Sequence, residues 1–363
     1  MKKYILFSIF FTVLLKGHSQ GNNSIDAHIF YGNIIEHAPE LKPLIKKHPT
    51  GIILQYNKHL LENNLFGNQF NFPDAGYTAI FQDFKTEEMG EVYSILRHYN
   101  FYLLNRNNSH QLKLTSGFGL GYATSPFDKE ENPKNWAIGS KVVAAVLLKL
   151  QYQHDYLIGN FGMNAGFSLI HYSNGSFNVP NLGVNTIAAT VGVHYDLNPK
   201  TLAPDRVLEK ETLKEPIHIN AVLRAGFNES LINGSGLFPF YTLSTYGDKK
   251  LTNVSTITFG ADFFFPVFMK DYIEWDSIQN DEPVSDADWK RAGLFAGYEM
   301  NMHSFSVIGQ IGYHVYYPYE YVSRIYERFG FKKRFGEHLF AALSLKINMF
   351  RAEGLEFGLG YRF

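Results

Sequence analysis

The chain ends in LEFGLGYRF (residues 355–363), where apolar side chains at every second position alternate with glycine or polar residues. Successive side chains of a β-strand point to opposite faces, so this stretch has one apolar and one polar face. The same period of two recurs in residues 217–227, 305–315 and 339–349. The alternation predicts an all-β protein built from antiparallel strands.

The composition excludes several classes of protein. The 363 residues include 33 Lys and Arg against 34 Asp and Glu, a net charge of −1, whereas a nucleic-acid binder would carry a basic excess. The absence of cysteine excludes a disulfide scaffold, a thiolate zinc site and an iron–sulfur cluster. No apolar run is long enough for a bundle of transmembrane helices.

Three features favour a transmembrane barrel over a water-soluble sandwich. The polar faces of the strands are rich in Gly, Ser, Asn and His, as a barrel lumen would be. Tyr and Phe gather at the ends of the alternating segments, where the aromatic girdles of a barrel lie. The chain also ends on Phe363, which resembles the C-terminal signature of bacterial outer-membrane proteins. We therefore expect a protein of the bacterial outer membrane.

Candidate strands begin near residues 25, 50, 76, 92, 110, 140, 160, 183, 216, 236, 252, 290, 305, 324, 338 and 354. Sixteen is an even number, as a bacterial barrel requires, but several segments alternate weakly. The prediction is an antiparallel transmembrane β-barrel of 12–16 strands. Closure leaves no edge strand with unpaired backbone N–H and C=O groups in lipid. We therefore expect one barrel over residues 20–363.

The first residues have the pattern of a secretory signal peptide. Lys2 and Lys3 give a basic start, and a mostly apolar run of 12 residues covers Tyr4–Leu15. Gly17 and Ser19 supply the small residues of a cleavage site. The sequence predicts a signal peptide at residues 1–19, removed after Ser19.

Strand parity sorts the connecting loops into two groups. Counted back from a periplasmic Phe363, the outer connections are 124–138, 175–182, 229–235, 269–289 and 318–323. The segments 198–215 and 248–251 lie on the periplasmic side. Residues 198–215 are long for a periplasmic turn, and their prolines and charges suggest a solvated linker.

One polar cluster breaks the alternation. Residues 161–169 carry apolar side chains at odd positions, and the odd series continues into His171 and Ser173. On the next strand the odd-numbered apolar series begins with Asn185. All three side chains are therefore expected on the lipid-facing side of one hairpin, at its outer end.

These residue types suit nucleophilic ester hydrolysis. His171 and Ser173 are two residues apart, roughly 7 Å at strand rise, which an imidazole can span to a hydroxyl. We expect Ser173 to attack, His171 to accept its proton and Asn185 to hold the ring. The Asn174-Gly175 turn would stabilise the oxyanion. The alternative is an interfacial histidine beside a Ser-Asn-Gly turn in a non-catalytic porin, adhesin or scaffold.

The pattern His-x-Ser-Asn, followed by Pro-Asn-x-Gly at residues 180–183, resembles the lipid A 3-O-deacylase (acyloxyacyl hydrolase) family of outer-membrane esterases. The resemblance implies an enzyme that removes an ester-linked acyl chain from the lipid A of lipopolysaccharide, without a cofactor. It implies His171 as base, Ser173 as nucleophile and Asn174 as an oxyanion contributor. The segment 132–140 is similar to longer bacterial relatives of the deacylase, with no defined role.

One position departs from that family. Where the family has a glutamate, 14 residues after the histidine, this chain has Asn185. His-x-Ser-Asn-Gly with an asparagine at that spacing also resembles outer-membrane phospholipase A, which works as a calcium-assisted dimer. A phospholipase and a homodimer therefore stay open. The segment 33–50, with His37 and His48, has no assigned role.

Overall fold

The computed structural model describes residues 22–198, 201–207, 215–230, 232, 234–302, 304–349 and 351–363. The predicted signal peptide at residues 1–19 lies outside this part of the chain. Most of the described residues are in β-strands that pair only with antiparallel neighbours. None of the described helices is long and apolar enough to cross a membrane.

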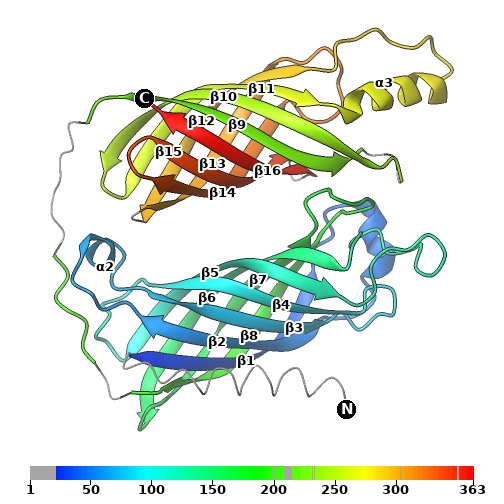
Figure 1. Ribbon diagram of the computed structural model, residues 1–363. Helices are drawn as coiled ribbons and strands as arrows, with labels where there is room; N and C mark the ends of the chain where they lie inside the picture. Colours follow the sequence, from blue (N-terminus) through cyan, green and yellow to red (C-terminus); the bar gives the residue numbers. More distant parts are fainter. Residues whose placement is uncertain are drawn as a thin grey trace.

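Eight strands form the first barrel (Figure 1). They are β1 (Asn23–Ile34), β2 (Thr50–His59), β3 (Asp74–Asp83), β4 (Glu91–Tyr102), β5 (His110–Ala123), β6 (Val142–Ile158), β7 (Phe161–Ser173) and β8 (Val184–Asp196). Each strand pairs with the next in the chain, and β1 pairs with β8, for example with Ile29 opposite Val191. The sheet therefore closes with no free edge.

The other eight strands form a second closed barrel. They are β9 (His218–Glu229), β10 (Leu237–Thr252), β11 (Ser255–Pro266), β12 (Arg291–Met302), β13 (Phe305–Tyr316), β14 (Ile325–Phe335), β15 (Leu339–Asn348) and β16 (Arg351–Arg362). Closure comes from β16 pairing with β9, with Leu359 opposite Leu223. The two barrels lie side by side, and the segment between β8 and β9 joins them (Figure 1).

The all-β prediction is confirmed, and the sixteen strands fall within the predicted 12–16. Each begins within three residues of its expected start. The expectation of one barrel over residues 20–363 is wrong, because β8 pairs with β1 and not with β9. Alternation along a strand is the same in either arrangement, so it does not specify which strands close the sheet. Eight strands enclose a lumen that side chains can fill.

The strands separate apolar and polar side chains as their alternation predicts. On β7, Phe161, Met163 and Phe167 are exposed on the outside of the barrel, while Asn164 and Ser168 are buried inside it. The same holds for the second barrel, where Phe357 and Leu359 point outward and Glu356 inward. Closed barrels with an apolar exterior satisfy every backbone group within lipid.

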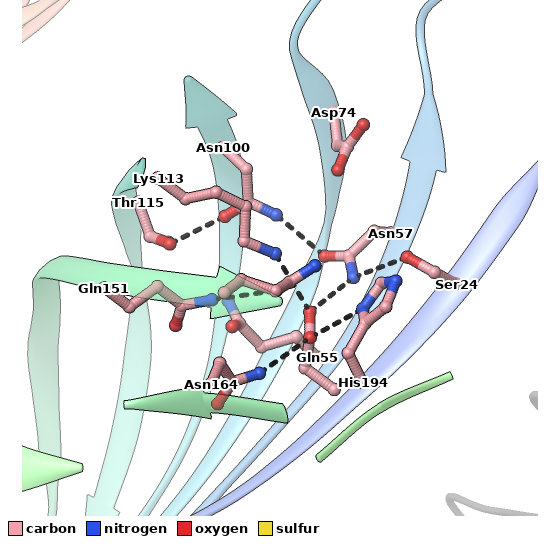
Figure 2. Close-up of polar contacts among 12 residues, drawn as sticks. Ser24, Gln55, Asn57, Asp74, Asn100, Lys113, Thr115, Gln151, Asn164 and His194 are labelled. Carbon is pink, nitrogen blue, oxygen red and sulfur yellow. Dashed lines mark hydrogen bonds and ion pairs between the residues drawn. The ribbon is translucent and has the colours of Figure 1, made fainter. Parts of the chain in front are cut away.

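Amide, hydroxyl and imidazole groups fill the first lumen together with charged side chains such as Lys113 and Asp74 (Figure 2). Asn57 donates to Ser24 Oγ at 3.1 Å and to a carboxylate oxygen of Asp26 at 2.7 Å. His194 Nδ1 lies 2.9 Å from the other oxygen of Asp26. Lys113 Nζ lies 3.8 Å from Asp26, the one described acidic side chain within ion-pair distance of it. This barrel is a polar, packed structure that also buries charged side chains, among them Asp74 and Lys149.

Close ion pairs run through the second lumen. Arg328 is completely buried and contacts Glu356 Oε2 at 2.5 Å and Asp262 Oδ2 at 2.9 Å. Lys332 pairs with Glu299 at 2.5 Å between Nζ and Oε1. These pairs satisfy charges that would otherwise be very costly to bury.

Within the described residues, three short helices lie in the loops. They are the 3₁₀-helix η1 (Pro39–Leu44), α2 (Leu65–Gln69) and α3 (Phe268–Gln279). Because consecutive strands run antiparallel, the loop with η1 and the β5–β6 and β7–β8 loops lie at one end of the first barrel. We refer to this end as the outer end. The β9–β10, β13–β14 and β15–β16 connections lie at the matching end of the second barrel.

Candidate active site

Ser173, His171 and Asn185 meet on the outside of the first barrel. His171 on β7 lies directly opposite Asn185 on β8 in the strand register. His171 Nδ1 lies 2.8 Å from Asn185 Oδ1, and His171 Nε2 lies 2.9 Å from Ser173 Oγ. Because an amide oxygen only accepts, Nδ1 carries the proton and Nε2 accepts from the serine hydroxyl. The structure thus brings the three residues predicted from the sequence into one hydrogen-bonded row.

The row sits where strand parity predicts it. His171 and Ser173 continue the outward series of Phe167 and Leu169, and Phe167 remains exposed while Ser173 is 6% exposed. The β7–β8 loop covers the serine. Polar side chains on an otherwise apolar outer face therefore lie in a partly desolvated site, where their mutual interactions are stronger than in water.

Glycines shape the loop over the serine, residues 174–183. Gly175 and Gly183 have φ of +66° and +75°, the left-handed region that side chains rarely adopt. A Cβ at Gly183 would lie 3.2 Å from His171 Cε1 and 3.4 Å from Ser173 Cβ. Gly183 therefore lets the loop approach the histidine and the serine closely.

Asn174 organises this loop with all of its N–H donors. Its main-chain N–H donates to Asn181 Oδ1 at 3.0 Å, and its Nδ2 donates to Asn178 O at 2.8 Å and Ser140 Oγ at 3.2 Å. Its Oδ1 accepts from Ser176 N at 3.0 Å. Every N–H donor of Asn174 is therefore engaged within the described residues, and its role in stabilising an oxyanion stays a prediction.

Two other donors belong to the loop over the serine. The main-chain N–H of Gly175, the second residue predicted to stabilise an oxyanion, has no acceptor among the described residues. The side-chain Nδ2 of Asn181 is buried and has no hydrogen-bond partner in the described part of the chain. The Oδ1 of the same side chain holds Asn174 N–H, which places the amide beside the residue that follows Ser173. Sequence reasoning missed Asn181, although it stands in the quoted Pro-Asn-x-Gly pattern.

The segment 132–140 packs against the β7–β8 loop and supports it. Main-chain N–H groups of Leu182 and Gly183 donate to Trp136 O at 3.1 Å and Ala137 O at 3.0 Å. Gly139 lies so close that a Cβ there would be 2.4 Å from Pro180 O. The segment that resembles longer relatives of the deacylase thus acquires a structural role: it fixes the backbone beside the candidate nucleophile.

His37 extends the row from the segment 33–50, to which the sequence assigned no role. Its Nε2 lies 3.0 Å from Leu182 O, and its Nδ1 lies 3.5 Å from Asn185 Nδ2. The loop between β1 and β2 thereby reaches Asn185 from the side opposite His171. No sequence pattern indicates this contact, because 148 residues separate the two side chains.

The second barrel also holds the β7–β8 loop. Ser176 Oγ donates to Ala352 O at 2.6 Å, and Glu229 N donates to Ser176 O at 3.0 Å. The Glu229 carboxylate accepts from Val179 N and from Gly234 N, each at 2.7 Å. Its two oxygens therefore tie the loop of one barrel to the β9–β10 loop of the other.

A cavity of about 420 Å³ opens between the barrels at this point. His171 and Ser173 line it from the first barrel, and β15 and the start of β16 line it from the second. Its volume falls within the roughly 300–1,000 Å³ of small-molecule sites. The candidate nucleophile therefore faces a space large enough for part of a lipid.

Comparison with solved structures finds other barrels of the outer membrane. The Acinetobacter baumannii outer membrane protein Omp33 is 9% identical, with 94% of this chain and 97% of that chain covered and a TM-score of 0.18. A mutant of the Rhodopseudomonas blastica porin is 10% identical, with 94% of this chain and 100% of that chain covered and a TM-score of 0.19. Scores this low carry no argument about this chain. No curated protein matches it.

Two family models match the chain, one on each barrel. The model described as lipid A 3-O-deacylase (PagL) matches residues 50–194, and the model described as acyloxyacyl hydrolase, C-terminal domain, matches residues 217–363. The first match contains the whole His171–Ser173–Asn185 row, and the boundary between the two matches falls in the linker between the barrels. The closed barrels with apolar exteriors belong in the outer membrane. This outer-membrane protein belongs to the lipid A 3-O-deacylase (PagL) family of acyloxyacyl hydrolases.

Proposed function

We propose that this protein is an outer-membrane esterase that removes an ester-linked acyl chain from lipid A, with Ser173 as its nucleophile. The observation that carries the proposal is the row Ser173–His171–Asn185, with contacts of 2.9 and 2.8 Å, on the lipid-facing side of the first barrel. A substrate that diffuses within the outer leaflet meets these side chains without entering a lumen. Family membership supports lipid A as the substrate.

The mechanism begins with attack of Ser173 Oγ on the ester carbonyl while His171 Nε2 takes the serine proton. The tetrahedral oxyanion would receive hydrogen bonds from Gly175 N–H and Asn181 Nδ2, the two donors without partners among the described residues. His171 returns the proton to the departing sugar oxygen, and the acyl group remains on Ser173. Water, deprotonated by His171, then releases the fatty acid and regenerates the serine.

Asn185 orients the imidazole in this mechanism but adds no charge. Its Oδ1 accepts from His171 Nδ1, which keeps Nε2 free to accept a proton. A glutamate would in addition stabilise the imidazolium that forms during attack. Asn185 therefore preserves the geometry of the family's acidic residue and gives up its electrostatic contribution.

Mass spectrometry of lipids incubated with the purified protein tests the proposal. We expect loss of one acyl chain from lipid A with the unsubstituted protein, no loss with Ser173→Ala, and no effect of a calcium chelator. Ser168→Ala is a matched control, because Ser168 lies on the same strand but is buried in the lumen without a hydrogen-bond partner among the described groups. Lysophospholipid that disappears with chelator would assign the protein to the phospholipases, and no product from either lipid would indicate a non-catalytic barrel.

A further inference from the structure

The outer face of β15 is an apolar wall of the cavity that contains Ser173. Leu345 and Ile347 point outward from the second barrel and line the cavity, while Ser344, Lys346 and Asn348 of the same strand are buried in its lumen. Met349 continues the wall beyond the end of the strand and is 46% exposed. The wall therefore belongs to the surface that the second barrel would otherwise present to lipid.

This wall reaches the loop that covers the candidate nucleophile. A Cβ on Gly175 would lie 3.4 Å from Leu345 Cδ1 and 3.9 Å from Leu355 Cβ. Gly175 is two residues from Ser173, and its N–H is one of the two donors proposed for the oxyanion. An acyl group whose carbonyl lies at Ser173 would thus have its chain within reach of Leu345.

The opposite side of the cavity is also partly apolar. Trp136, Val179, Pro180 and Leu182 line it from the first barrel. Two acids nearby are already engaged: Glu229 binds two main-chain N–H groups, and Glu353 accepts from Lys346 and Asn348 at 2.7 and 2.6 Å. The space between the barrels therefore offers a hydrocarbon chain two apolar sides, and these two acids beside it are satisfied.

We propose that the outer face of β15, formed by Leu345 and Ile347 with Met349 at its end, binds the acyl chain of the ester that Ser173 attacks. The inference rests on the proposed function and adds a binding site that the second barrel supplies. We call the part of the cavity along this face the groove. The sugar headgroup then remains outside the groove, and the fatty acid is released along it.

The physical contribution of such a groove is positional. A hydrocarbon chain gains little hydrophobic free energy on leaving lipid tails for leucine and isoleucine side chains, because both are equally apolar. What the groove adds is a fixed direction for the chain and hence a fixed place for the carbonyl. Small displacements of a reacting group lower rates strongly. Changes in the groove should therefore lower kcat for long chains more than they raise KM.

Ester hydrolysis by the full-length protein, with p-nitrophenyl esters from acetyl to palmitoyl, tests the proposal. In Ile347→Trp and Leu345→Trp the larger ring fills the groove. We expect the ratio of kcat for the palmitoyl ester to kcat for the acetyl ester to fall by about tenfold or more. Leu359→Trp is the control, since Leu359 is 74% exposed on the same barrel and does not line the cavity. Heat-dependent electrophoretic mobility verifies that each variant still forms closed barrels.

The outcomes separate the two proposals. Unchanged palmitoyl turnover in both tryptophan variants would overturn the acyl site while leaving Ser173-dependent hydrolysis intact. An equal loss for acetyl and palmitoyl esters would also contradict it, because it would indicate damage to the catalytic row itself. Equal activity in the unsubstituted protein and Ser173→Ala would overturn the proposed function, and the acyl site with it.

Discussion

The two barrels share one architecture and differ in where their polar groups lie. Each has eight antiparallel strands that close on themselves, and each has an apolar exterior. The first barrel breaks its apolar exterior with His171, Ser173 and Asn185 at the outer end. The second keeps Leu345 and Ile347 on the outer face that lines the same cavity. Its lumen holds close ion pairs around Arg328.

The difference shows that the residues that close a barrel and the residues proposed to react follow from different features of the sequence. Alternation with a period of two is enough to build a barrel, whichever polar residues occupy the lumen. The proposed chemistry arises in the first barrel where three polar side chains replace apolar ones on the outside. The second barrel contacts the loop over these residues through Glu229 and Ala352. We therefore infer a division of labour, with the reacting groups on one barrel and their support on the other.

The largest expected effect is that of Ser173→Ala. Without Oγ no acyl-enzyme forms, and we expect turnover of lipid A to fall by about 10³-fold or more. Release of fatty acid, followed by mass spectrometry, measures it. The comparison partner in the second barrel is Ser344→Ala, which removes a lumenal hydroxyl that donates to Glu356 at 3.0 Å. An equal loss in both variants would contradict the division of labour.

The next effect concerns the lumens. Arg328→Leu leaves Asp262 and Glu356 buried without their main partner, so we expect a destabilisation of about 3–5 kcal/mol. Unfolding by urea, followed by the heat-dependent mobility of the barrel, measures it. Lys113→Leu in the first barrel should cost much less, since the Lys113 ammonium lies 3.8 Å from Asp26. A larger cost for Lys113→Leu would reverse our interpretation of the two lumens.

Glu229→Gln tests whether the second barrel supports the site. The amide keeps one acceptor oxygen and turns an NH₂ group toward either Val179 N–H or Gly234 N–H, so the loop over Ser173 loosens. We expect kcat to fall by about tenfold, because the loop carries the two donors proposed for the oxyanion. Glu320→Gln is the control: Glu320 is an exposed acid of the same barrel, paired with Arg324 at the surface. Equal activity in both variants would show that the contact is not needed.

The smallest effect is expected for Asn185→Glu. A carboxylate at this position still accepts from His171 Nδ1, so activity should be retained or rise by a few fold, on the order of the gain from one charge-assisted hydrogen bond. Steady-state hydrolysis of lipid A measures it. Asn185→Ala removes the acceptor and should lower turnover. Loss of activity in Asn185→Glu would show that Asn185 does not orient His171.

The sequence by itself determined the strands, their faces and the outward direction of His171, Ser173 and Asn185. These properties are local, because the pleat sends successive side chains to opposite faces. Strand pairing then placed Asn185 opposite His171, as a short hairpin over residues 174–183 must. The three candidate catalytic residues were therefore predictable from fewer than twenty consecutive residues.

Only the tertiary structure decided which strands close each barrel and what surrounds the row. The pairing of β8 with β1 joins residues more than 150 positions apart, as Ile29 and Val191 show, and no periodicity encodes it. The contact of His37 with Asn185, the engagement of all Asn174 donors and the wall formed by Leu345 depend on loops that meet after closure. Such contacts follow from the packing of segments that are distant in the sequence. The sequence pattern therefore indicated the candidate nucleophile, and the tertiary structure determined which residues surround it.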